Sequence, residues 1–182
     1  MPATRTASTK KASASADKRS TASKAHDAVS LLEADHKEVK TLFKAYQKLV
    51  DADATDDEKQ AVAEEICNAL TVHATIEEEL LYPAARDVLK EDDLVDEATV
   101  EHASAKDLIA QIQGMDPSDS LYDAKVKVLG EYIDHHVKEE ENEMFPKLRK
   151  SELDLAALGT DLQARKDELM SELAEGAETP VH

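Results

Sequence analysis

The chain contains one eleven-residue pattern twice, as HATIEEELLYP (residues 73–83) and as HVKEEENEMFP (residues 136–146). In each copy a histidine is followed by a glutamate four positions later and by a proline ten positions later. Residues four apart on a helix lie on one face, about 5 to 6 Å from each other. Each copy therefore offers an imidazole and a carboxylate to the same point in space.

A shorter repeat accompanies the first one. The pair Asp35-His36 corresponds to Glu101-His102, and in each case a lysine follows the histidine by four positions. The chain thus repeats a unit of two helices, in which the first helix carries a histidine and the second carries a histidine and a glutamate. Two such units predict a four-helix bundle.

Composition and periodicity agree with this prediction. Between Asp27 and Gln113 there is no glycine and a single proline, and no run of β-branched residues alternates with polar ones as a strand requires. Apolar residues recur at three- and four-residue steps in four segments, each with a histidine on its apolar face. We expect an all-α, up-down-up-down bundle with helices over about 27–50, from the capping box at Thr55-Glu58, over about 94–113, and from Asp116-Pro117, where a cap precedes a proline.

The chain divides into three parts. Residues 1–25 are rich in Ala, Ser, Thr and Lys, cannot offset their own ordering entropy, and are expected to form a disordered basic tail. Residues 26–150 are expected to form the four-helix bundle. Residues 151–182 predict an extra C-terminal helix and tail, with the helix broken or bent at Gly159, that covers the bundle or a partner subunit.

Charge and cysteine content exclude several classes of protein. The formal net charge is −18, although residues 1–24 carry six basic groups and one acidic group, so the folded part should repel nucleic acid and anionic membrane. The lone Cys67 excludes an intramolecular disulfide. No apolar run approaches the roughly 18 residues of a membrane span, and no apolar signal-peptide core is present. We expect a soluble, cytoplasmic protein whose oligomeric state stays open.

The matched histidines and glutamates are the candidate metal ligands. A single histidine on an apolar helix face is usually a core residue, but four at matched positions, with two glutamates that need a cation if buried, favour metal binding. Nitrogen and oxygen donors without thiolate suit two iron ions, with zinc or manganese as alternatives. The six ligands are His36, His73, Glu77, His102, His136 and Glu140, with Glu141 as the alternative to Glu140.

Other polar side chains near the candidate ligands are expected to lie outside the metal site. Tyr132 lies one turn before His136 and could reach a metal-bound ligand, but core packing is the favoured interpretation. His135 points about 100° away from His136 and should lie outside the ligand set. The remaining acids near the two motifs are expected to form solvated faces; they are Glu78, Glu79, Glu139, Glu141 and Glu143.

These residues resemble the pattern of the hemerythrin-like HHE cation-binding family, with one element on each helix over about residues 27–150. The resemblance implies a non-heme, carboxylate-bridged di-iron centre held by the six residues above. It also shows a departure, because oxygen-carrying hemerythrins have a further histidine where this chain has Lys106. The resemblance is closer to di-iron proteins implicated in iron-sulfur cluster repair and nitric oxide stress.

Three functions remain open. The first is a di-iron protein that binds or reacts with oxygen, nitric oxide or peroxide in a stress or sensing role, with a redox partner. The second is an iron storage or donation module that serves iron-accepting apoproteins, iron-sulfur cluster repair included, without catalysis. The third is an interaction protein with a structural metal, which open coordination positions disfavour. The sequence does not decide whether the chain is an enzyme.

Overall fold

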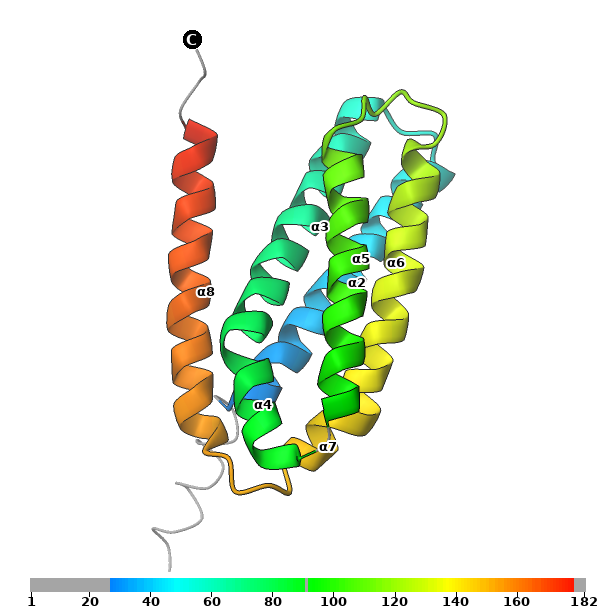
Figure 1. Cartoon of the computed structure of the whole chain (residues 1–182). Helices are drawn as coiled ribbons and strands as arrows, with labels where there is room; N and C mark the ends of the chain where they lie inside the picture. Colours follow the sequence, from blue (N-terminus) through cyan, green and yellow to red (C-terminus); the bar gives the residue numbers. More distant parts are fainter. Residues whose placement is uncertain (1–26, 91, 179–182) are drawn as a thin grey trace, which may run out of the picture.

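Four long helices form the body of the protein in the computed structural model, which describes residues 27–90 and 92–178. They are α2 (Ala28–Asp51), α3 (Asp56–Ile76), α5 (Asp92–Gln113) and α6 (Tyr122–Glu139). Figure 1 shows them side by side, and each helix contacts the next one in the chain while α6 returns against α2. The predicted all-α bundle is therefore confirmed. The predicted disordered tail, residues 1–25, lies outside the described residues.

The first two helices begin where their caps were predicted. Asp27 accepts a hydrogen bond from the backbone N–H of Ser30 at 2.7 Å, which caps α2. At α3 the Thr55 hydroxyl accepts from the Glu58 N–H, and the Glu58 carboxylate accepts from the Thr55 N–H. This reciprocal capping box satisfies two backbone donors that the first turn of a helix leaves unpaired.

The predicted start of the fourth helix is wrong. Residues 116–121 form successive turns, and α6 begins only at Tyr122. The Asp116 carboxylate accepts from both the backbone N–H and the hydroxyl of Ser118, at 2.9 and 2.5 Å. Aspartate caps turns as readily as helices through such local bonds, so the Asp-Pro pair does not start a helix here.

Each copy of the eleven-residue pattern widens into a π-helical turn. The turns η1 (Glu77–Leu81) and η2 (Glu140–Met144) lead into the short helices α4 (Tyr82–Leu89) and α7 (Phe145–Leu148). Tyr82 N–H donates to the Glu77 carbonyl and Phe145 N–H to the Glu140 carbonyl, five residues back. The proline that follows each of these residues has no N–H and crowds the carbonyl four residues earlier, which disfavours regular α-helix at this point.

Two apolar clusters fill the bundle on either side of a polar layer. The cluster near the π turns is built from large side chains that are at most 2% exposed, among them Leu32, Ile76, Leu81, Met144, Phe145 and Leu148. The opposite cluster includes Ile66, Leu70, Val126 and Leu129. Gly130 allows α6 to approach α2 closely, because a Cβ atom there would lie 3.0 Å from the Phe43 ring. None of the helices in the described ranges is long and apolar enough to cross a membrane.

The extra helix α8 (Leu155–Glu178) packs along α2, α3 and η1 (Figure 1). It is continuous through Gly159, so the predicted break there is wrong. A glycine inside a helix costs about 1 kcal/mol relative to alanine. The side chain of Leu162 is fully buried in the core, and such burial contributes roughly 1.5–3 kcal/mol, which outweighs that cost.

Candidate metal centre

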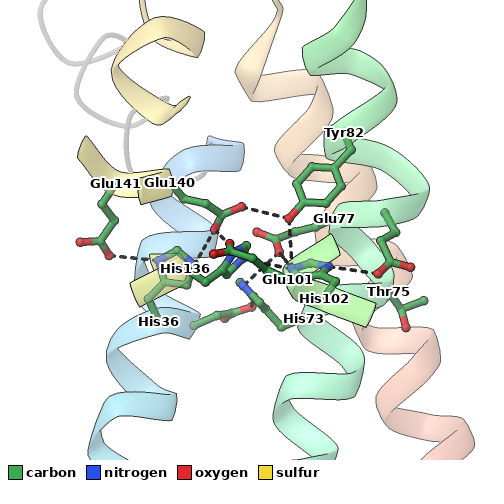
Figure 2. A network of polar contacts seen from close by, with 12 residues as sticks. His36, His73, Thr75, Glu77, Tyr82, Glu101, His102, His136, Glu140 and Glu141 are labelled. Atoms are coloured by element: carbon green, nitrogen blue, oxygen red, sulfur yellow. Dashed lines mark hydrogen bonds and ion pairs between the residues drawn. The ribbon is translucent and has the colours of Figure 1, made fainter. Parts of the chain in front are cut away.

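The structure brings the six predicted ligand residues together in the polar layer of the bundle (Figure 2). One histidine comes from each long helix, and the two glutamates come from the first positions of η1 and η2. Every one of these side chains is buried, and Glu77 is 0% exposed. Apolar residues above and below the layer exclude water from the charged groups, which strengthens their mutual interactions. The six residues are His36, His73, Glu77, His102, His136 and Glu140.

The inward-facing atoms are arranged with approximate two-fold symmetry. Oε2 of Glu77 lies 3.3 Å from Nε2 of His73 and 3.4 Å from Nε2 of His102. Oε2 of Glu140 lies 3.3 Å from Nε2 of His36 and 3.5 Å from Nε2 of His136. Each carboxylate therefore stands between imidazoles of two different helix pairs.

Two carboxylates hold imidazoles from the outer side. Nδ1 of His36 lies 3.0 Å from Glu141 Oε1, and Nδ1 of His102 lies 3.0 Å from Glu78 Oε1. Glu78 and Glu141 are partly solvated as expected, with side chains 32% and 41% exposed, but each also contacts an imidazole of the centre. Sequence reasoning missed these contacts, although both residues directly follow a predicted ligand glutamate.

The imidazoles of His136 and His73 face the acidic residues Glu101 and Asp35, each of which directly precedes another ligand histidine in the sequence. Nδ1 of His136 lies 2.7 Å from Glu101 Oε2, and Nδ1 of His73 lies 3.6 Å from Asp35 Oδ2. An imidazole whose Nδ1–H is directed to a carboxylate presents the lone pair of Nε2 to the centre. Glu78, Glu101 and Glu141 thus orient three of the imidazoles in the way that metal ligation requires, and Asp35 faces the fourth beyond hydrogen-bond distance.

Lysines compensate two of the outer carboxylates. Lys106 Nζ donates to both oxygens of Glu78, at 2.7 and 2.6 Å. Lys166 of α8 donates to Asp35 Oδ1 at 2.5 Å. Although burial acts to raise the pKa of Asp35, its interactions with the nearby His73 and Lys166 prevail and hold that pKa below its usual value. Lys106, at the position where oxygen carriers have a histidine, is thus engaged with Glu78.

The inner atoms lack the hydrogen bonds that buried polar groups normally have. Both oxygens of Glu77, Oε2 of Glu140, Nε2 of His36 and both ring nitrogens of His73 have no hydrogen-bond partner. Burial, followed by the neighbouring Glu140 carboxylate, raises the pKa of Glu77 to about 7. Such groups are costly unless a cation compensates them, so the residues present fit a bound metal.

The pKa of the other inner carboxylate, Glu140, is shifted in the opposite direction to that of Glu77. Burial acts to raise the pKa of Glu140, but His36 and the other nearby imidazoles outweigh it and hold the pKa well below its usual value. For His36, burial acts to lower the pKa, but Glu140, Glu77 and Glu141 raise it to about 9. Without metal, His36 and Glu140 therefore behave as an ion pair inside the bundle.

Residues 27–148 match the hemerythrin HHE cation-binding domain, a span that contains all six residues of the centre. The chain belongs to this family. The resemblance drawn from the repeated motifs is confirmed, and with it the general role of a cation-binding domain. At the centre of this hemerythrin-like domain, two groups of side chains could hold a metal ion, and they share Glu77: His36, His73, Glu77 and Glu140 form one, and Glu77, His102 and His136 form the other.

Two individual proteins are similar to this hemerythrin-like chain. A solved hemerythrin HHE cation-binding domain-containing protein from Mycobacterium kansasii is 23% identical and has a TM-score of 0.70; the match covers 84% of this chain and 93% of that one. A protein of Nostoc sp. named DNA nickase is 31% identical over 142 residues. That match covers 76% of this chain and 39% of the relative, so the chain spans about two fifths of the relative's length.

Tyr82 is a member of the hemerythrin-like centre that sequence reasoning missed. Its hydroxyl lies 3.2 Å from Glu140 Oε1 and 3.0 Å from Nε2 of His102. Burial, followed by the charges of Glu77 and Glu140, raises the pKa of Tyr82 above its ordinary value, so the phenol keeps its proton. The repeat contained a signal, because Tyr82 and the matching Phe145 both directly precede the repeated proline.

Tyr132, which the sequence predicted to pack in the core, lies at the surface instead. Tyr132 is 37% exposed on α6, so the favoured expectation that it packs in the core is wrong. At the inner face the aromatic partner is Phe145, whose ring stacks on His36 with centroids 5.6 Å apart. The repeat thus supplies one phenol and one phenyl ring to the two sides of the centre.

Proposed function

We propose that the six inner residues hold two iron ions and that a ligand of diatomic or peroxide size binds or reacts there. The donor set supports this, because imidazole and carboxylate without thiolate suit iron, while zinc and manganese remain weaker candidates. The two candidate groups that share Glu77 support a pair of ions with a common carboxylate. We further propose a stress or sensing role with a redox partner.

The size of the inner cavity carries the proposal. A small space of about 20 Å³ adjoins all four histidines and is otherwise lined mainly by apolar side chains, among them Val39, Leu70, Ile133 and Val137. A space of this size admits one molecule as large as water. It suits oxygen, nitric oxide or hydrogen peroxide, and it is too small for an ordinary metabolite.

A groove gives a route from the surface to this cavity. It lies between α2 and α6 and has a volume of about 510 Å³. Four residues line both the groove and the inner cavity; they are His36, Val39, Ile133 and Val137. The groove and the inner cavity are therefore adjacent at these four side chains.

Iron, when bound, supplies open coordination positions and electrons for the ligand. The outer carboxylates of Glu78, Glu101 and Glu141 keep three of the imidazoles oriented toward the centre. The Tyr82 hydroxyl donates to Glu140 Oε1 and so holds that carboxylate in position at the centre. The apolar lining limits access of water.

A substitution that fills the cavity tests the proposal. Val137→Phe should block the inner space, and the rate at which nitric oxide, oxygen or peroxide changes the stopped-flow spectrum of the ferrous protein should fall at least tenfold. Iron content, measured by mass spectrometry, should stay unchanged. Val128→Phe is the matched control, because Val128 is 46% exposed on the same helix. Ferrous native protein that shows no spectral change with any of the three ligands would exclude the proposed activity.

Iron donation is the second candidate. Complete burial of Glu77 and Glu140 favours resident ions over transferable ones. Chelator competition separates the two functions: loss of iron within seconds supports donation to an apoprotein, and retention over hours supports a resident centre.

DNA cleavage, suggested by the name of the Nostoc relative, is not part of the proposed function. The match covers 39% of that protein. The net charge of −18 opposes contact with a phosphate backbone. We propose that the domain acts without nucleic acid or membrane as partner.

A further inference from the structure

A second group of ligand-type side chains lies on the outer face of α5 and α6, outside the six inner residues. Nε2 of His135 lies 3.3 Å from Glu139 Oε1 and 3.7 Å from Glu101 Oε1. The three donor atoms lie within 4.8 Å of one another. One imidazole and two carboxylates form a donor set that suits a divalent transition-metal ion.

Glu101 is the buried member of this outer group. It is 8% exposed, and its Oε2 accepts the 2.7 Å hydrogen bond from His136. Its other oxygen, Oε1, is turned toward His135 but lies beyond hydrogen-bond distance, and no other described residue donates to it. Glu101 therefore has one carboxylate oxygen that accepts no hydrogen bond and is directed to the outer face of α5 and α6.

In the helix pair α2 and α3, the residue that corresponds to Glu101 is Asp35, and its carboxylate is paired with a lysine. Asp35 directly precedes His36 as Glu101 directly precedes His102, and Asp35 also contacts an imidazole, that of His73. The second oxygen of Asp35 accepts from the Lys166 ammonium group of α8. In this half of the bundle, a cation from α8 completes the outer carboxylate.

No described helix covers the outer face of α5 and α6. The residues there are metal-ligating, where the corresponding residues under α8 are apolar. Val72 and Ile76 precede the ligands His73 and Glu77, and they are 3% and 0% exposed on the side that α8 covers. The residues at the matching positions in the second copy are His135 and Glu139. Where α8 supplies an ammonium group to one half, the other half thus has two additional metal-ligating side chains.

We propose that His135, Glu139 and Glu101 Oε1 bind a divalent metal cation, which takes at Glu101 the place that the Lys166 ammonium group takes at Asp35. Through Glu101 this cation is linked to His136 of the inner centre. The outer site does not depend on the proposed function, because none of its three residues belongs to the inner set.

The test is a titration that distinguishes the outer site from the inner one. The full-length protein is loaded with Zn²⁺ and treated briefly with a chelator, which removes Zn²⁺ from the exposed outer site and leaves the buried inner site filled. It is then titrated with Mn²⁺, which binds nitrogen and oxygen ligands more weakly than Zn²⁺ and so does not displace it from the inner site. The electron paramagnetic resonance signal of free Mn²⁺ reports binding. Paramagnetic broadening of the His135 ring resonances reports the location.

Native protein should bind one Mn²⁺ per chain with broadening at His135. His135→Val, which copies Val72, and Glu139→Gln should each weaken this binding by at least ~10-fold. Glu131→Gln is the matched control on the same helix and should bind Mn²⁺ as the native protein does. The proposal is overturned if native protein binds no Mn²⁺, if His135→Val binds it equally well, or if the broadening lies elsewhere. Failure of Zn²⁺ loading would count against the inner centre alone.

Discussion

Glu77→Leu should stabilise the protein in the absence of metal and abolish its stabilisation by metal. Glu77 is fully buried with both carboxylate oxygens lacking hydrogen-bond partners. An unsatisfied buried polar group costs roughly 1–3 kcal/mol, and leucine replaces it with an apolar group of similar size. At about pH 8, above the pKa of about 7, the carboxyl is ionised and this cost is fully present.

We therefore expect the unfolding free energy of the metal-free variant to rise by about 2 kcal/mol, which corresponds to a rise in Tm of roughly 4–8 °C for a chain of this size. With iron at a hundredfold excess over Kd, native protein should gain about 2.7 kcal/mol that the variant does not gain. The order of stability should thus reverse between the two conditions.

Circular dichroism at 222 nm during thermal unfolding, with chelator and with ferrous iron, measures both effects. Glu143→Leu removes an exposed glutamate of η2 and should change stability by less than about 0.5 kcal/mol. A metal-free Glu77→Leu protein that unfolds at a lower temperature than the native one would refute the reasoning, because the glutamate would then stabilise the bundle by itself.

Three further predictions concern other residues of the centre. The double variant His73→Ala, His136→Ala should contain no bound iron by mass spectrometry yet keep its helical circular dichroism, since caps and apolar faces specify the helices; retained iron would contradict the ligand assignment. The pKa of His36 is raised from 6.5 to about 9, so its contribution to metal-free stability is complete below about pH 6.5 and is lost as the pH rises through 9. In urea unfolding the stability difference between native protein and His36→Gln should shrink over that window, and a difference independent of pH would exclude the ion pair. Tyr82→Phe should lower metal-free stability by about 1 kcal/mol in the same assay, while Tyr132→Phe should leave it unchanged; equal effects would remove any special role of the buried phenol.

The repeated motif made much of the fold and the centre predictable. Spacings of three and four residues are local properties of a helix, so they identify the inward face of α2, α3, α5 and α6 without knowledge of how the helices pack. The capping box at Thr55 is local in the same sense. The short connections then favour antiparallel neighbours.

Local sequence patterns did not predict the structure correctly where the same type of residue occurs in two kinds of local structure. Asp116 caps a turn by bonding Ser118, and the same bond types would cap a helix. The helix α8 continues through Gly159 because side chains on either side of this glycine pack against the bundle. Both outcomes depend on packing that the segment itself does not encode.

The sequence by itself determined that four histidines and two glutamates stand on inward helix faces, because helical periodicity assigns each residue to a face. Only the tertiary structure decided which carboxylate meets which imidazole: Glu78 contacts His102 and Glu101 contacts His136, in each case between two different helical segments. It also decided that α8 covers one half of the bundle and brings Lys166 to Asp35. Such pairings depend on the rotation and offset of packed helices, which follow from the fit of many side chains at once and from no single spacing along the chain.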